Sequence, residues 1–466
     1  MIKLRDKLKI AVLFVCALGV FSGCSSVATQ KAFYEPIEKE LRQGNFSSAV
    51  AQIEEAKTNG KYKKKDRFLY YLDAGLAYHY NLQFDSSISR LTQAEDAADE
   101  LYTRSISRAV GSIILNDNIL EYTGEDYEIL YSNLIKALNY ISLDLFDDAF
   151  VEIRRANEKL NLLEQKYREE ADMLNAQDRD DSSRVEINYE AKPSRFNNSA
   201  FARYMSLHMY AADGKYDDAE LDYDLMRRAF IEQPHIYDFE MPEVIYASDS
   251  LSVLSIVGLV GFAPVKEAMN LRLRTDKELK LVQILYDDPK MPHAEYGHIP
   301  MDVKEDYYFK FSIPQLVSRP TDIESIRVFA NDTYLGDLRL IEDIGKAAIE
   351  TFEAKKSMIY LKTLARAIMK GLKTHNMKKK ADKGSGGWLK KLAIDAITDF
   401  TENADLRCSR LLPGYILVGD FELPPGQHDI KIQILDVSGN IIEEKFFESF
   451  QVRKNDFNLL EVIRLN

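Results

Sequence analysis

The sequence has few cysteines and none of the short motifs that mark common enzymes or metal sites. Three cysteines among 466 residues are too few for a scaffold held together by disulfides. It contains no HExxH pair, no Cys/His cluster with zinc spacing and no GxSxG sequence. We therefore predict a protein that is not an enzyme and that holds no metal and no cofactor.

The sequence also lacks an apolar run long enough to cross a membrane and has no excess of positive charge. Its longest apolar stretches, residues 10–21 and 251–263, are shorter than the about 20 residues that a spanning helix needs. Lys and Arg number 61 against 74 Asp and Glu, a net charge of −13, which argues against nucleic acid as a partner. A chain of this length can bury a sizeable core, and two or three domains are expected.

Residues 1–23 have the form of a secretory signal, with four basic residues before the apolar stretch 10–21. Ser22, Gly23 and Cys24 follow, and this sequence resembles the bacterial lipobox. The resemblance implies that Cys24 becomes the lipidated N-terminus, anchored by acyl chains such as palmitate at about 0.8 kcal/mol per buried CH₂. Ser25, where Asp would retain the protein at the inner membrane, implies an outer-membrane anchor facing the periplasm. The alternative is an ordinary cleaved signal.

Residues 24–246 are predicted to form a helical domain, because apolar residues recur three and four positions apart. An aromatic residue followed by Ser or Asp recurs four times, at Phe46, Phe84, Phe146 and Tyr216. We expect each to begin the second helix of a hairpin, with the hydroxyl or carboxylate capping free N–H groups. Gly44 and Gly214, two residues before their aromatics, are expected to have positive φ in the turns.

A wider spacing of small and aromatic residues is shared by these segments and resembles the tetratricopeptide repeat. The aromatics lie farther apart than the 34 residues of that repeat, so additional segments are expected to interrupt the array. A generic helical bundle is the alternative. The residues expected to pack between repeats are Gly75, Tyr78, Phe84, Ala137, Tyr140, Phe146, Ala149, Tyr210, Tyr216 and Ala219.

Residues 247–466 are predicted to form an antiparallel β-sandwich-like domain with a helical insertion at about 343–402. The insertion should contain helices at about 344–372 and 388–400. His293 and His298 fall in a Pro-rich segment that we interpret as a surface loop. The segments with strand-like alternation are 251–263, 269–273, 279–285, 307–313, 325–329, 334–340, 415–423, 428–435, 441–452 and 459–463.

Within the insertion, residues 366–391 include nine Lys or Arg, and Asp382 is the one acidic residue among them. Such a segment could contact anionic lipid at about 1 kcal/mol per basic side chain, or acidic cell-wall polymer. A solvated, flexible loop is the alternative. The residues expected at such a contact are Lys378, Lys379, Lys380, Lys383, Trp388, Lys390 and Lys391.

Three stretches, residues 116–160, 258–266 and 404–428, resemble a family of uncharacterised Gram-negative outer-membrane lipoproteins with tetratricopeptide-like repeats and a C-terminal β domain. The likeness covers most of the mature chain and implies no established activity. The family tends to have a Trp where this chain has Cys408 and Ser409. Cys408 is expected to be a small core residue.

Two ion-pair arrangements are expected in these stretches. Arg154 and Arg155 should pair with Glu152 and Glu128 between neighbouring helices, although they could equally line a peptide groove. Asp405 and Arg407 should brace the return from the insertion to the strands.

Taken together, these features favour an α+β protein that acts as a lipid-anchored periplasmic scaffold or adaptor. It would bind an envelope protein or peptide along the concave surface of its repeats. The alternative is a regulator or binder of peptidoglycan or anionic lipid that acts through the basic insertion. An enzyme whose site is spread over several loops is a third possibility.

Overall fold

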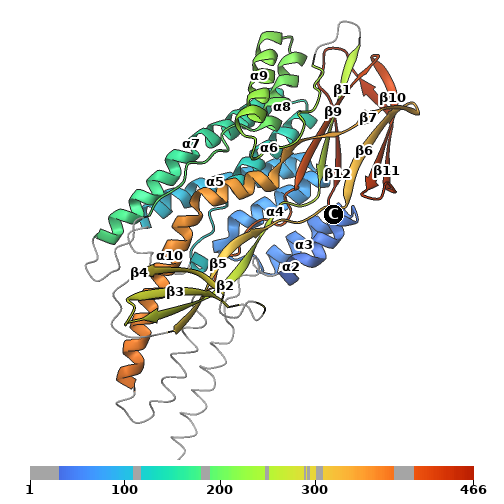
Figure 1. Cartoon of the computed structure of the whole chain (residues 1–466). Helices are drawn as coiled ribbons and strands as arrows, with labels where there is room; N and C mark the ends of the chain where they lie inside the picture. The colour runs from blue at the N-terminus through green and yellow to red at the C-terminus, as the bar shows by residue number, and fades with distance from the viewer. Residues whose placement is uncertain are drawn as a thin grey trace, which may run out of the picture.

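The computed structural model describes residues 31–108, 117–179, 189–246, 251–287, 290, 294–300, 308–381 and 403–466. The protein is a mixed α+β structure, with helices in the N-terminal half and sheets in the C-terminal half (Figure 1). This arrangement confirms the predicted α+β class.

The helical half consists of four successive helical hairpins in the described residues. The second helix of each hairpin begins at Phe46, Phe84, Phe146 or Tyr216, as the recurring aromatic predicted. The hairpins pair α2 (Lys31–Arg42) with α3 (Phe46–Thr58), α4 (Arg67–Tyr80) with α5 (Phe84–Arg108), α6 (Asp126–Ser142) with α7 (Phe146–Arg179), and α8 (Ala200–Ala212) with α9 (Tyr216–Glu232). Two short 3-10 helices, η2 (Lys64–Asp66) and η4 (Asp117–Ile119), lie in the connections.

All four hairpin turns have the same backbone geometry. The residue two before the aromatic has positive φ: 74° at Gly44, 57° at Leu82, 58° at Asp144 and 72° at Gly214. In each turn the next N–H donates to a carbonyl five residues earlier, as in Gln83 N to Tyr78 O at 2.9 Å. The positive φ predicted for the two glycines is confirmed, and the same conformation recurs at two positions without glycine.

The predicted capping role of the Ser and Asp side chains is wrong at the two hairpins where the cap is defined. The N-cap residues there are Asn45 and Lys215, and neither side chain caps its helix. Asp217 and Asp218 instead lie in the first turn of α9, where a negative charge interacts favourably with the positive end of the helix dipole.

The C-terminal half contains three four-stranded sheets. The inner sheet has the order β12-β1-β9-β8, the outer sheet β11-β10-β6-β7 and the third sheet β4-β3-β2-β5. The strand bounds are β1 Ser252–Val260, β2 Val265–Asp276, β3 Leu281–Tyr286, β4 Glu295–Pro300, β5 Tyr308–Val317, β6 Ile323–Ala330, β7 Thr333–Asp337, β8 Arg339–Asp343, β9 Tyr415–Leu423, β10 Gly426–Asp436, β11 Ile441–Val452 and β12 Asn458–Arg464.

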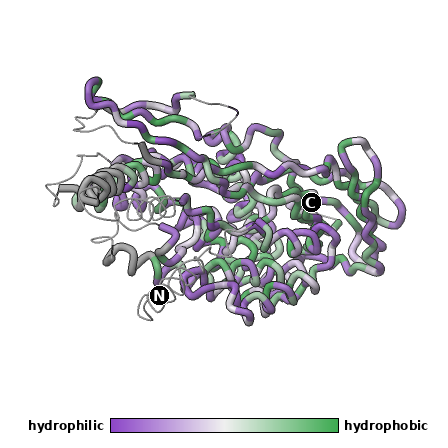
Figure 2. The backbone as a smooth tube through the Cα atoms, turned by 90° about the horizontal axis from the view of Figure 1, so that it is seen from below, coloured by the Kyte–Doolittle hydropathy of each residue, from purple (hydrophilic) through white to green (hydrophobic). Residues whose placement is uncertain are grey.

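The inner sheet is buried on both faces. Leu254 and Ile256 of β1 share a core with Val328 and Ile432 of the outer sheet. Other inner-sheet residues, such as Val257, pack in the larger core that is continuous with the helices. The layers therefore follow the order helices, inner sheet, outer sheet (Figure 1). Figure 2 views the molecule from below and marks the C-terminus, beside which Leu465 is fully buried in the larger core.

Three expectations for the strands were wrong. Strand β12 pairs with β1 in parallel, whereas we expected only antiparallel pairs. The segment 334–340 forms two strands in different sheets, because the chain crosses between them at the buried Leu338. His298, placed in a surface loop by the sequence, lies in β4.

The third sheet packs against the predicted insertion rather than against the other sheets. The insertion begins with α10 (Ile344–Ala381), which runs past the expected end near residue 372. Leu364 and Ala367 of this helix share a core with Leu271 and Phe311 of the third sheet. The helix also contacts α6, so it connects the third sheet to the helical half (Figure 1).

We predict that Leu82→Gly stabilises the protein by about 1 kcal/mol, because a leucine with positive φ is strained and glycine is not. Leu82 is 65% exposed, so little packing is lost. The matched control is Leu221→Gly in α9, where the leucine is 59% exposed and helical. This change should lower stability by about 1 kcal/mol. Denaturant unfolding of both variants checks the opposite signs, and a destabilised Leu82→Gly would contradict the strain argument.

Candidate functional site

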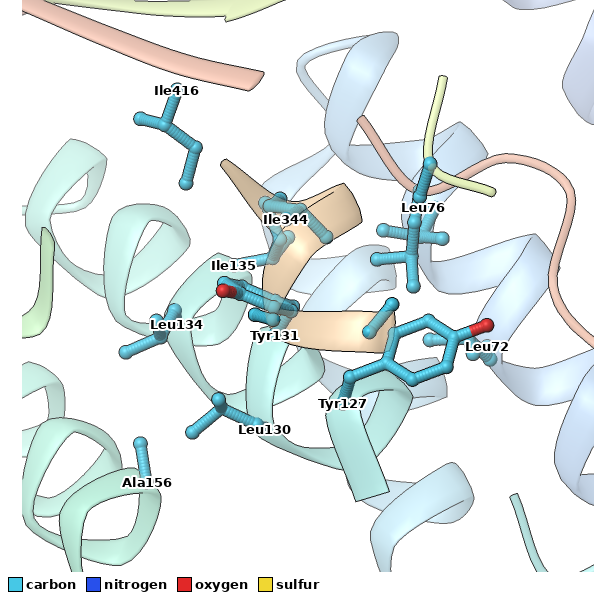
Figure 3. Close-up of a cluster of buried hydrophobic side chains, with 14 of the residues drawn as sticks. Leu72, Leu76, Tyr127, Leu130, Tyr131, Leu134, Ile135, Ala156, Ile344 and Ile416 are labelled. Atoms are coloured by element: carbon cyan, nitrogen blue, oxygen red, sulfur yellow. The ribbon is translucent and has the colours of Figure 1, made fainter. Parts of the chain in front are cut away.

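The first helices of the hairpins, α4, α6 and α8, are covered by the chain's own C-terminal half. Almost every residue of α6 is buried. Figure 3 shows Leu72 and Leu76 of α4 beside Tyr127 and Tyr131 of α6, with Ile344 from α10 between these helices. The inner face of the helical array is therefore an interior core, and the concave groove expected from the sequence is filled by the protein itself.

Buried carboxylates hold the two halves together. Glu342 of β8 is fully buried and accepts hydrogen bonds from the hydroxyls of Tyr131 and Tyr237, both at 2.9 Å, and from Phe201 N at 3.1 Å. Burial raises the pKa of Glu342 to about 7, although these donors oppose the shift. Asp420 of β9 accepts in the same way from Tyr204 OH at 2.6 Å.

A second junction is formed around Ser409, on the segment that returns from the insertion. Its hydroxyl donates to Asp73 at 2.9 Å, and its N–H donates to Glu128. Asp73 also accepts from Tyr34 at 2.7 Å, and Glu128 accepts from Tyr122 at 2.7 Å. Burial raises the pKa of each carboxyl to about 7. These groups are enclosed and hydrogen-bonded, which is the pattern of structural rather than catalytic carboxylates.

Arg407 fixes the same returning segment and is itself 1% exposed. Its guanidinium pairs with Asp405 at 2.6 Å and with Asp66 at 3.1 Å, and it donates to the carbonyl of Leu120 at 2.9 Å. The predicted brace between Asp405 and Arg407 is present. Cys408 beside it is a free, buried cysteine, and burial raises the pKa of its thiol to about 11, in agreement with a core residue.

The predicted repeat-packing residues divide into core residues and surface residues. Ala137, Ala149 and Ala219 are fully buried. Gly75 lies so close to α5 that a Cβ added there would be 2.5 Å from Leu91. Tyr216 is 50% exposed. Tyr78, Tyr140, Phe146 and Tyr210 are partly buried and pack against the cores, and Phe84 is partly buried.

The predicted ion-pair network is present with different members. Arg155 pairs with Glu152 at 2.9 Å, and Lys136, fully buried, joins Glu152 to Glu95 at 2.9 and 2.7 Å. Lys159 also pairs with Glu95. Although burial opposes the shift, the two ammonium groups hold the pKa of Glu95 at about 2. Glu128 and Arg154 do not take part.

A cavity of about 320 Å³ opens between α5, α6 and α7, beside a buried charge cluster. Asp126 on its wall pairs with Lys166 at 2.5 Å and with Lys355 at 3.2 Å. Burial alone would raise its pKa, but these cations hold it well below the usual range. Lys355 also binds Glu125, so α10 is joined to the start of α6. The charges are thus matched within the protein.

The larger cavity, about 670 Å³, lies where the α6–α7 and α8–α9 turns meet the loop before β12. We call it the hairpin-end cleft. Phe146 and Phe150 of α7 and Tyr210 of α8 line it, and the rings of Phe150 and Tyr210 are 4.6 Å apart. The exposed Arg154 also lines this cleft.

The acidic wall residues of the cleft are Asp144, Asp147, Asp213 and Asp456, and Lys215 also lines it. Asp213 pairs with Lys215 at 2.5 Å and Asp456 with Arg453 at 3.2 Å. Asp147, together with Asp144 at 4.0 Å from Arg453, is therefore the carboxylate most open to a ligand's cationic group.

The sequence did not predict that the residues of the hairpin-end cleft come together. Phe146 and Tyr210 were named as packing residues, and Arg154 was considered as a possible groove residue. Their meeting with Asp456 depends on the loop before β12, more than 200 residues away in sequence. The paired acidic residues at the helix starts could have indicated this cleft, but we interpreted them as helix caps.

Several predicted contact residues lie outside the described residues or have side chains that are not described. Cys24, Lys383, Trp388, Lys390 and Lys391 belong to the first group. Lys378, Lys379 and Lys380 lie in the last turns of α10, and nothing is known of their side chains. The binding of lipid or cell wall by the insertion therefore stays a prediction.

Within the described part of the chain, no group of three or more His, Cys, Asp or Glu side chains is placed to hold a metal ion. No described helix is both long and apolar enough to cross a bilayer. No protein-family model, no curated protein and no solved structure matches the chain.

We predict that stability rises as the pH falls from 8 to about 5.5. Asp73, Glu128 and Glu342 titrate near pH 7 when folded but near about 4 when unfolded, so the folded state binds more protons in this window. Carboxylates with lowered pKa values, such as Glu95, reduce stability only below about pH 4.5. The thermal midpoint should therefore be several degrees higher at pH 5.5 than at pH 8.

Glu342→Gln should make this pH dependence shallower, because the amide stays neutral at both pH values. Glu422→Gln, at an exposed position of the neighbouring strand, is the matched control and should leave it unchanged. A midpoint that falls between pH 8 and 5.5 in the unmodified protein would contradict the prediction.

Proposed function

We propose that this protein is a lipid-anchored periplasmic scaffold or adaptor that binds a segment of another envelope protein. Its helical half would be an array of tetratricopeptide-like repeats, and its C-terminal half a β-sandwich-like domain with a helical insertion. The four hairpins with a common turn and the close approach of Gly75 to Leu91 support the repeat relationship.

The hairpin-end cleft is the observation that carries this proposal. The inner face of the array is occupied by the protein's own strands, so a partner would have to bind on the outside. The cleft offers about 670 Å³, a pair of aromatic rings and several carboxylates. Aromatic side chains supply contact area at low entropic cost, and carboxylates select cationic groups. A peptide segment with apolar and basic side chains fits this chemistry.

The membrane anchor would keep the scaffold at one surface and raise its effective concentration for partners there. Cys24 precedes α2 by only a few residues. The first hairpin would thus lie next to the membrane.

We predict that Cys24→Ala releases the protein from the outer-membrane fraction into the soluble periplasm, since a thiol is required for lipidation. Cell fractionation and intact-mass measurement check this outcome. The matched control is Cys408→Ala, which removes a buried cysteine and should leave the protein at the membrane. A Cys24→Ala protein that remains membrane-bound would contradict the anchor but not the cleft.

We predict that a photo-crosslinking amino acid at position 154 captures a discrete envelope protein in living cells. The same group at Leu221, exposed on α9 and outside the cleft, is the control and should not give this product. Arg154→Glu should raise recovery of the captured protein several-fold, because it makes the cleft wall more acidic toward a basic segment. Arg228→Glu, exposed on α9, should not. Equal products from positions 154 and 221 would contradict a specific partner in the cleft.

A further inference from the structure

The outward face of the outer sheet carries a row of three aromatic side chains and one lysine, one from each of its four strands. Lys431 of β10 lies opposite Phe446 of β11 on one side and opposite Phe329 of β6 on the other. Phe329 in turn lies opposite Tyr334 of β7. The Lys431 ammonium is 4.7 Å from the centre of the Phe329 ring, and the Phe329 and Tyr334 rings are 5.5 Å apart. We call these four residues the aromatic row.

The aromatic row faces solvent. Neighbouring residues along the same strands, Val328, Ile430 and Ile432, point the other way into the core between the two sheets. Phe446 is 64% exposed and Tyr334 is 53% exposed. The outer sheet lies on the side of the molecule away from the helices (Figure 1), so neither half of the described chain covers this face.

A row of polar side chains runs beside the aromatic row, two residues along β11, β10 and β6 and three along β7, where the register shifts. Gln433 lies opposite both Glu444 and Arg327, and Arg327 lies opposite Asp337. The Gln433 amide donates to Glu444 at 2.7 Å, and Arg327 and Asp337 are 4.0 Å apart. The two rows are about 7 Å apart. A line of hydrogen-bonding groups thus lies along one side of the aromatic row.

The charges of this face nearly cancel, with two basic side chains against three carboxylates. Arg327 is opposed by Asp337, and Lys431 is opposed by Asp332 at 3.2 Å. Glu444 is bonded to an amide. A near-neutral face on an acidic chain favours an uncharged, polar ligand over a basic or acidic one.

We propose that this face binds the glycan strands of the bacterial cell wall. A pyranose ring has an apolar C–H face that stacks on an aromatic ring, and hydroxyls at its edge that bond to carboxylate, amide and guanidinium groups. Neighbouring strands are about 4.8 Å apart, so Phe446 and Phe329 lie about 10 Å from each other, and the row spans about 14 Å. Consecutive rings of a β-linked glycan are separated by close to one strand spacing, so a few sugars match the row.

The size of the face favours a glycan over a protein. A fully covered aromatic side chain buries about 150–250 Å², so three partly exposed rings offer only a few hundred Å². A stable protein interface takes about 800 Å² from each partner. Strand addition at the β11 edge is also disfavoured, because that strand is interrupted near Ser449, which has a φ of 54°.

The inference takes the periplasmic location from the proposed function and nothing else. None of the residues of the aromatic row lines the hairpin-end cleft. Either site can therefore fail in experiment without the other.

The test is cosedimentation of the full mature chain, in detergent, with cell-wall sacculi stripped of attached protein by protease. We expect Phe446→Ala combined with Tyr334→Ala to reduce the bound fraction at least tenfold. The matched control combines Leu221→Ala with Tyr296→Ala, which removes two exposed side chains elsewhere. It should bind like the unmodified protein, and so should Arg154→Glu. Thermal unfolding verifies that each variant is folded.

Soluble chitotetraose, a β-linked amino-sugar oligomer, provides a second measurement. It should raise the thermal midpoint of the unmodified protein in a concentration-dependent way and should not affect the double variant of the aromatic row. Failure of the unmodified protein to bind stripped sacculi would overturn the proposal. Equal binding by the row variant would also overturn it. Binding only to sacculi that retain protein would overturn it in favour of a protein ligand.

Discussion

The rest of the structure depends on carboxylates from one half of the chain that accept hydrogen bonds from tyrosines of the other half. Glu342 of β8, held by Tyr131 and Tyr237, is the clearest example. An ionised carboxylate that is buried without hydrogen-bond donors costs several kcal/mol. Strand β8 therefore cannot bury Glu342 without the tyrosines of the helical half. The helices and the inner sheet are therefore one cooperative unit, although their sequences suggest two domains.

This joint core determines where ligands can bind. An open helical array would offer its inner face, but here Ser409 and Ile344 belong to segments that fill it. The surfaces on which a partner could bind are the end of the hairpins and the outward face of the outer sheet. The two surfaces differ in chemistry, since the cleft has four carboxylates against two basic side chains, whereas the charges beside the aromatic row nearly cancel.

Local features of the fold could be predicted from the sequence because interactions between residues close in sequence determine them. The helix starts at Phe84 and Phe146 follow from a turn and an aromatic residue, and most strands follow from two-residue alternation. Parallel pairing of β1 with β12, and the filling of the inner face, could not be predicted. They depend on contacts such as Tyr80 to Leu411, which join residues 331 positions apart. The site residues were missed for the same reason, because Phe146 meets Asp456 only after the whole chain has folded.

The parallel strand β12 has a consequence for the order of events during synthesis. Arg464 donates to the carbonyl of Arg42 in α2, and Leu465 is fully buried among the helices. When the chain is synthesised or exported with its N-terminus first, the cores of the earlier hairpins stay incomplete until these residues emerge. The nascent protein would expose apolar helix faces throughout that interval, which makes it a natural client for holding chaperones.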